Sequence, residues 1–90
     1  MYAVVTQATI HDLEQAKKVL NEQGIPRISQ ASGFVSGHWA HLDGNRGRGM
    51  MIFESEEAAR AGAEMVRANA PAGPAVTIDS IEVGEVVGHA

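Results

Sequence analysis

The sequence has no cysteine among its 90 residues, which excludes disulfides, thiolate zinc sites and cysteine nucleophiles. Its four histidines form no HExxH or HxH pattern and no His/Asp cluster with metal-site spacing. His38 and His41 are three residues apart, and on a strand this spacing places them on opposite faces. We therefore expect no metal and no cofactor.

Positive charge and long apolar runs are also scarce. Seven basic residues stand against 11 acidic ones, and the resulting net charge of −4 disfavours binding to a nucleic-acid backbone or an anionic membrane. No apolar run approaches the roughly 18–20 residues of a membrane-spanning helix. The chain opens with Met-Tyr-Ala-Val-Val and lacks a basic leader. We therefore expect a cytoplasmic protein with no nucleic-acid partner and no membrane partner.

Aromatic residues make up only 4% of the chain, so a pocket with aromatic walls must use Tyr2, Phe34, Trp39 or Phe53. The length predicts a single domain, 1–90. Its core is small, because a chain of this size buries only roughly 60–68% of the surface that its unfolded form exposes. With disulfides and metals excluded, a partner subunit is the remaining way to enlarge that core.

The first half of the chain alternates between strand and helix signals. Residues 2–8 are rich in β-formers and predict a strand. A helix follows, with Thr9 as its cap and Asp12 in the capping-box position. Gly24 is expected to end this helix and Pro26 to prevent it from restarting, so residues 26–33 are expected to be irregular.

The second half predicts a hairpin, a helix and a long strand. The expected elements are a strand over 33–42, a turn over 43–47, a strand over 49–53, a helix from the Ser55 cap to Asn69-Ala70, and a strand over 75–87. The inward side of the helix is expected to carry Ala58, Ala61 or Gly62, and Met65. A shift of the apolar period at Asp79-Ser80 predicts a bulge in the last strand.

The order β-α-β-β-α-β predicts an α+β, ferredoxin-like fold, in which a four-stranded antiparallel sheet carries both helices on one face. The strands are nevertheless apolar on both sides, as at Val4-Val5 and Met50-Met51-Ile52-Phe53. An open apolar face of several hundred Å² would leave on the order of ten kcal/mol of burial unused. We therefore expect a homodimer that packs through its sheet faces.

Trp39 is the candidate for binding a flat organic ligand. Strand alternation places Val35, Gly37 and His41 on its face, and Phe34, His38 and Leu42 on the other. Trp39 would form one wall of a pocket, His41 would donate or accept a hydrogen bond or a proton, and Phe53 would add a second aromatic wall. In the alternative interpretation, Trp39 packs in the core or the dimer interface and His41 is an ordinary polar group.

Arg46 and Arg48 flank Gly47 at the expected hairpin tip. Two guanidinium groups beside exposed backbone amides form a candidate anion site. The alternative is a solvated surface loop.

The chain from Tyr2 to about Val87 resembles the dimeric α/β-barrel superfamily, and in particular its antibiotic-biosynthesis-monooxygenase-like (ABM-like) domains. The resemblance rests on the valine-rich first strand, the Gly-Phe-Val-Ser-Gly-His-Trp segment 33–39, the Gly-rich turn, and the Ile-Phe-Glu-Ser-Glu-Glu-Ala-Ala segment 52–59. It implies a homodimer with two sheets face to face and a pocket in each subunit between sheet and helices. In some members that pocket oxidises quinol-like or tetrapyrrole substrates without a dedicated metal or flavin.

The enzymatic members commonly carry a Trp where the third strand meets the second helix, and a His about two turns into that helix. Here the junction reads Phe53-Glu54-Ser55, and the helix has no histidine. The resemblance therefore implies a protein that binds a small planar ligand, either as a divergent cofactor-independent monooxygenase or as a non-catalytic structural or interaction protein of the same fold.

Residues 46–53 also resemble the third strand of the RNA-recognition motif, which stacks bases on aromatic side chains. Arg48 and Met50 occupy the stacking positions here, and each lost stacking group forfeits about 1–3 kcal/mol per base. We therefore expect no RNA binding.

Overall fold

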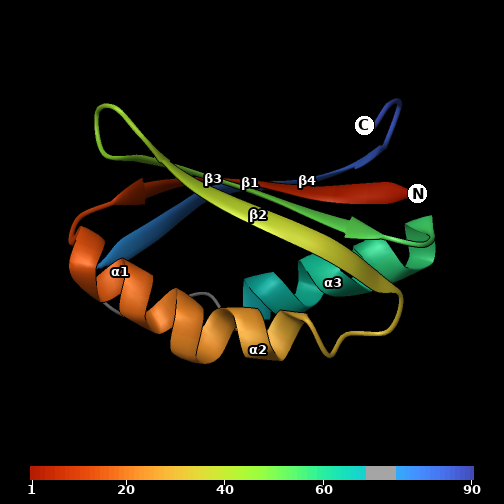
Figure 1. The fold of residues 1–90 in the computed structure, drawn as a ribbon, viewed down its shortest axis with the longest axis horizontal. Helices are drawn as coiled ribbons and strands as arrows, with labels where there is room; N and C mark the ends of the chain where they lie inside the picture. Colours follow the sequence, from red (N-terminus) through yellow and green to blue (C-terminus); the bar gives the residue numbers. More distant parts are fainter. Residues whose placement is uncertain (69–74) are drawn as a thin grey trace.

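The computed structural model describes residues 1–68 and 75–90 (Figure 1). Its elements are β1 (Tyr2–Ile10), α1 (Leu13–Val19), the π-helix η1 (Leu20–Gly24), α2 (Ile25–Ile28), β2 (Phe34–Leu42), β3 (Arg46–Phe53), α3 (Glu56–Ala68) and β4 (Val76–Glu85). The predicted end of the second helix, near Asn69-Ala70, lies outside the described residues. No described helix is long and apolar enough to cross a membrane.

The strands form one antiparallel sheet in the order β2-β3-β1-β4, and the described helices all lie on one face of it (Figure 1). Strand β1 is central, so Val4 has Met51 beside it on one side and Val83 on the other. The predicted α+β, ferredoxin-like fold is confirmed.

The core lies between the sheet and α3, where small side chains let the helix approach closely. Phe53 and Val4 are completely buried, and Ala59 packs on them from α3. A Cβ atom at Gly62 would overlap the Phe53 ring, so the absence of a side chain there brings the helix onto the ring. This fit sets the rotation of α3. Its buried residues are Ala59, Gly62 and Ala63. The predicted stripe is therefore confirmed at Gly62, whereas Ala58 and Met65 are only partly buried against the core and Ala61 is exposed.

The N-terminal cap of the first helix is Asp12, and the prediction of Thr9 is wrong. Strand β1 continues to Ile10, so Thr9 is still extended and its hydroxyl donates a hydrogen bond to the Asp79 carboxylate at 2.8 Å. The Asp12 carboxylate accepts a hydrogen bond from the backbone N–H of Gln15, three residues on, at 3.1 Å.

The prediction that the helix stops at Gly24 is also wrong. Gly24 has an ordinary helical φ of −64°, and the chain stays helical through η1 and α2 to Ile28. A proline in a helix removes one N–H donor and its ring clashes with the carbonyl four residues earlier. The wider π-turn just before Pro26 is a way to accommodate that ring without ending the helix. The irregular connection is therefore confined to the residues after Ile28.

A bulge at Val35 changes which side chains share a face of β2. The register of β2 against β3 shifts between Phe34 and Ser36, so alternation holds only beyond that point. Phe34 consequently lies on the helix side, where its ring meets the Phe53 ring edge-on at a centroid distance of 5.7 Å. The prediction that Phe34 faces away from Trp39 and that Val35 shares its face is wrong.

The hairpin turn is shorter than predicted. Gly44 and Asn45 supply the positive φ angles of 77° and 60°, and β3 already begins at Arg46. Arg46 and Arg48 are therefore strand residues. The predicted bulge in the last strand is confirmed, because the register of β4 against β1 shifts at Asp79.

The face of the sheet opposite the helices is uncovered by any described helix (Figure 1), and it carries apolar side chains beside charged ones such as Arg48 and Glu82. Met50 and Leu42 are 48% and 36% exposed on it, and Val5 and Ile52 are half-buried. We call these four side chains the open-face cluster.

Candidate functional site

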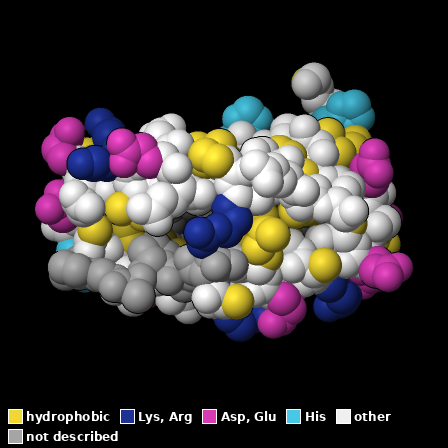
Figure 2. Space-filling model, turned by 90° about the horizontal axis from the view of Figure 1, so that it is seen from below, with side chains coloured by type: hydrophobic (Ala, Val, Ile, Leu, Met, Phe, Trp, Pro, Cys, Tyr) yellow, Lys and Arg dark blue, Asp and Glu magenta, His cyan; other side chains and the backbone are white. Residues whose placement is uncertain are grey.

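The main cavity lies between the helix side of the sheet and the helical segment formed by α1, η1 and α2. Its volume is about 1170 Å³, which slightly exceeds the range of about 300–1,000 Å³ typical of small-molecule pockets. Helix α3 packs on β1, β3 and β4, and α2 packs on α3. Because α3 covers the other strands, the space beneath α1, η1 and α2 lies over β2 and β3. Seen from the helix side, the surface is hollowed between apolar side chains and a basic one (Figure 2).

The indole of Trp39 forms the floor of this cavity and lies flat on the sheet. A Cβ atom at Gly37 would lie 2.6 Å from Cη2 of its six-membered ring. A Cβ atom at Gly49, on the neighbouring strand, would lie 2.8 Å from Cδ1 of its five-membered ring. The ring thus spans two glycines on adjacent strands, with one face on the backbone, and it lines the cavity.

His41 lines the same cavity, two residues beyond Trp39 on β2. It lies opposite Gly47 of β3, which in turn lies opposite Ala8 of β1. Gly47 is buried beneath Ile10, whereas the His41 side chain is exposed. The register of β2 against β3 confirms the prediction from alternation that Gly37, Trp39 and His41 share one face.

The remaining predicted site residues lie elsewhere. Phe53 is completely buried beneath Gly62 and does not line the main cavity. The Nε of Arg46 donates to the Asp43 carbonyl at 2.8 Å, and a terminal nitrogen of Arg48 donates to the Gly47 carbonyl at 2.8 Å. Arg48 borders the main cavity, but strand alternation places its side chain with Met50 on the sheet face opposite the indole.

Sequence reasoning missed the helical wall of the cavity. Ile25, Arg27 and Ile28 line it from α2, in a segment that the proline made look irregular. It also missed Thr6 and Met51, buried residues of the central strands. The signal for the floor was present, since glycines recur at alternate positions 47 and 49 of β3 and leave one face of the strand without side chains.

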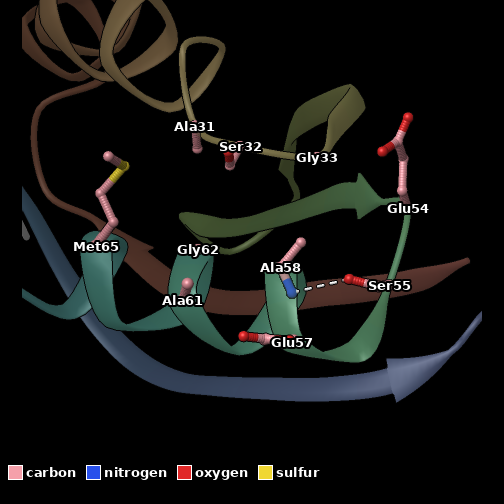
Figure 3. Close-up of a pocket in the computed structure, with 10 residues that line it drawn as sticks. All are labelled: Ala31, Ser32, Gly33, Glu54, Ser55, Glu57, Ala58, Ala61, Gly62 and Met65. Atoms are coloured by element: carbon pink, nitrogen blue, oxygen red, sulfur yellow. Dashed lines mark hydrogen bonds between the residues drawn. The ribbon is translucent and has the colours of Figure 1, made fainter.

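A second cavity of about 450 Å³ lies between the loop before β2 and the start of α3 (Figure 3). Its walls are mostly small residues, and the Glu54 and Glu57 carboxylates at its rim point in different directions. The Ser55 hydroxyl accepts a hydrogen bond from the Ala58 backbone N–H at 3.1 Å, which confirms the predicted cap. The described residues that line this cavity include neither an aromatic residue nor a cation, so the Trp39 cavity is the stronger candidate.

Within residues 1–68 and 75–90, no three His, Asp or Glu side chains lie close enough together to hold a metal ion. The candidate chemistry therefore rests on the indole surface, the imidazole and the apolar walls.

Comparisons with known proteins give matches by structure only. No family model matches the chain, and no curated protein matches it by sequence. Among solved structures, an arginine-to-serine mutant of MhuD with two manganese protoporphyrin IX molecules bound per active site superposes with a TM-score of 0.74. The match covers 100% of this chain and 98% of that one, at 20% identity.

Two further structures match over nearly the whole chain. The heme-degrader MhuD from Mycobacterium tuberculosis, with two hemes bound in its active site, has a TM-score of 0.58 and 26% identity, covering 97% of this chain and 98% of that one. A dimeric ferredoxin-like protein from an uncultured marine organism has a TM-score of 0.66 and 15% identity. The match covers 99% of this chain and 97% of that one.

Proposed function

From its fold, which is that of the ABM-like domains of the dimeric α/β-barrel superfamily, we propose that this protein binds a flat, largely apolar organic molecule in the Trp39 cavity. The observation that carries the proposal is the indole lying flat on Gly37 and Gly49 at the floor of a cavity of about 1170 Å³. A flat ligand would stack on the outer face of that ring, since offset-stacked aromatic pairs add about 0.5–1.5 kcal/mol beyond their buried area.

The walls suit such a ligand. Leu20 and Ile25 line the cavity from the helical segment, and Met51 lines it from the sheet. Methionine adapts its shape to an irregular partner and makes favourable sulfur-aromatic contacts. His41 supplies a directional polar contact beside the indole. Planar tetrapyrroles are the ligands named for two of the similar structures, and they are the first class to test.

The absence of the family's helix histidine favours binding over oxidation. Residues 56–68 of α3 contain no histidine, and the junction before it, Phe53-Glu54-Ser55, contains no Trp. The candidate base for a divergent oxidation is His41, which lines the same cavity and would accept a proton from a bound quinol. In a cofactor-independent monooxygenase the substrate would supply both electrons, one oxygen atom of O₂ would enter the substrate, and the other would leave as water. The alternative is a non-catalytic protein whose dimer is the functional unit.

We propose in addition that a second copy of the chain covers the open-face cluster. Four strands at about 4.8 Å spacing and about eight residues long at about 3.3 Å per residue present about 500 Å² in projection. That footprint is of the order of the roughly 800 Å² of accessible surface that a stable interface buries on each partner. One of the similar structures is described as dimeric.

Fluorescence tests the binding proposal, because Trp39 is the one tryptophan and reports directly from the cavity floor. Protoporphyrin IX, hemin and a naphthoquinone are titrated at micromolar concentration. We expect all three flat ligands to quench the emission saturably, whether or not they carry a metal. A panel without saturable quenching would contradict the proposal and leave the non-catalytic alternative.

Variants locate the binding. Because Trp39→Leu removes the fluorophore, its affinity is measured by calorimetry, and we expect it to fall about fivefold or more. His41→Ala is compared with His89→Ala, since His89 lies in the exposed C-terminal segment away from the cavity. If His41→Ala and His89→Ala change the ligand affinity equally, His41 is not part of the binding site.

A further inference from the structure

The charges on the sheet face opposite the helices are separated by strand. Arg46 and Arg48 of β3 lie on this face, because they alternate with the buried glycines of that strand. Glu82 of β4 lies on it as well, since its two neighbours in the chain pack against the core on the other side. Asp79 of β4 joins them through its hydrogen bond with Thr9. Since β3 and β4 flank β1, the face is basic on one side of β1 and acidic on the other.

These opposite charges do not neutralise one another within the chain. Two strand spacings, about 10 Å, separate the backbones of β3 and β4. Among the residues that the structure describes, neither Arg48 nor Glu82 takes part in an ion pair. The Arg48 guanidinium donates one hydrogen bond to the Gly47 carbonyl at 2.8 Å, and most of its N–H donors remain. The Asp79 carboxylate, in contrast, already accepts a hydrogen bond at 2.8 Å. Glu82 is therefore the acceptor that still needs a cation.

Two-fold symmetry decides which charges meet when two copies pack through this face. The axis of such a dimer lies between the two sheets, and the same surface is used on both copies. An axis that runs across the strands places β3 on β3 and β4 on β4, so like charges oppose each other. An axis that runs along β1 exchanges the two sides and places the basic strand β3 of one copy opposite the acidic strand β4 of the other. Electrostatic complementarity favours the second arrangement.

We infer that the homodimer axis runs along β1 and that Arg48 of each copy pairs with Glu82 of the other. This inference rests on the proposed dimer and specifies how its two copies are arranged. The open-face cluster supplies the apolar contact, which is non-directional and does not fix an orientation by itself. The Arg–Glu pair, which the symmetry repeats twice, supplies the orientation. A guanidinium and a carboxylate can form two parallel charge-assisted hydrogen bonds.

The test exchanges the two charges and measures the dissociation constant of the dimer by analytical ultracentrifugation at low salt. Arg48→Glu and Glu82→Arg each bring like charges together twice, so each alone should raise the dissociation constant about tenfold or more. An equal mixture of the two variants restores both Arg–Glu contacts in a heterodimer. We expect its dissociation constant to lie within about threefold of the wild-type value. Added salt should narrow the difference between each single variant and the wild type.

Two controls separate this pairing from a general effect of net charge. The double variant Arg48→Glu/Glu82→Arg keeps the wild-type net charge and should form a homodimer again. Lys18→Glu changes the net charge as Arg48→Glu does, but Lys18 is exposed on α1, on the helix side of the sheet. It should leave the dimer intact, and its mixture with Glu82→Arg should stay weaker than the mixture of the two reversed variants.

The outcomes separate the pairing from the dimer itself. If a single reversal leaves the dissociation constant unchanged, or if the mixture and the double variant associate as weakly as the single variants, the pairing is overturned and the dimer stands. If a reversed variant does not fold by circular dichroism, Arg48→Gln and Glu82→Gln replace it. Either one breaks both pairs, so the two together should weaken the dimer no more than one alone, and additive effects would overturn the pairing. A monomeric wild type would contradict the proposed dimer and the pairing together.

Discussion

Two residues without side chains determine how Trp39 lies. An alanine at Gly49 would place its Cβ 2.6 Å from the Thr6 hydroxyl oxygen and 2.8 Å from Cδ1 of the indole. We expect Gly49→Ala to lower the free energy of unfolding by about 1–3 kcal/mol, the usual cost of overpacking, and to weaken ligand binding by tilting the ring. Urea unfolding measures the first effect. The control is Gly84→Ala, where no atom lies within 4 Å and the change should stay within about 0.5 kcal/mol.

For Gly62→Ala, the sign of the change in the free energy of unfolding shows how closely α3 approaches the sheet. In an exposed helix, replacing glycine by alanine adds about 0.5–1 kcal/mol of stability. At Gly62 the new Cβ would overlap the completely buried Phe53 ring, so we expect Gly62→Ala to destabilise the protein by about 1–3 kcal/mol. Thermal unfolding distinguishes a stabilised variant from a destabilised one. A stabilised variant would mean that α3 does not approach the sheet as described.

At the scale of elements, the continuous first helix is the feature most open to test. Gly24 has a helical φ of −64°, and its nearest obstacle is the flexible end of Leu20 at 3.3 Å. Gly24→Ala should therefore raise the free energy of unfolding by about 0.5–1 kcal/mol. Gly44→Ala, at a φ of 77°, should lower it by about 1–2 kcal/mol. If Gly24→Ala lowers the free energy of unfolding as much as Gly44→Ala does, the helix ends at Gly24 after all. In that case α2 does not form part of the cavity wall.

The order of elements could be predicted because apolar periodicity and turn residues report local structure. The bulge at Asp79 could be predicted too, because it interrupts that periodicity. The π-turn before Pro26 could not, since a Gly-x-Pro sequence usually ends a helix and only tertiary packing keeps this one together. The bulge at Val35 left no mark in the pattern and reversed the expected side of Phe34. Trp39 and His41 were found because they lie beyond that bulge, whereas Arg27 was hidden by the missed helix.

At the scale of the whole molecule, the open-face cluster predicts association. Met50 is 48% exposed on that face. Met50→Glu should place a charge in each half of a self-complementary interface and convert a dimer to a monomer. Light scattering at micromolar concentration measures the mass. Gln30→Glu adds the same charge at an exposed position after α2 and should leave the dimer intact. A wild-type protein that is monomeric under these conditions would contradict the dimer proposal.

The cavity and its indole floor lie at the centre of the functional account, and a crystal structure of the protein with protoporphyrin IX tests both at once. We predict a ring stacked parallel to Trp39, above Gly37 and Gly49, with the α2 helix as its second wall. A ring bound in the cavity beside Ser55 and Ala58, or a Trp39 that stays packed while the ligand lies outside the cavity, would contradict the account.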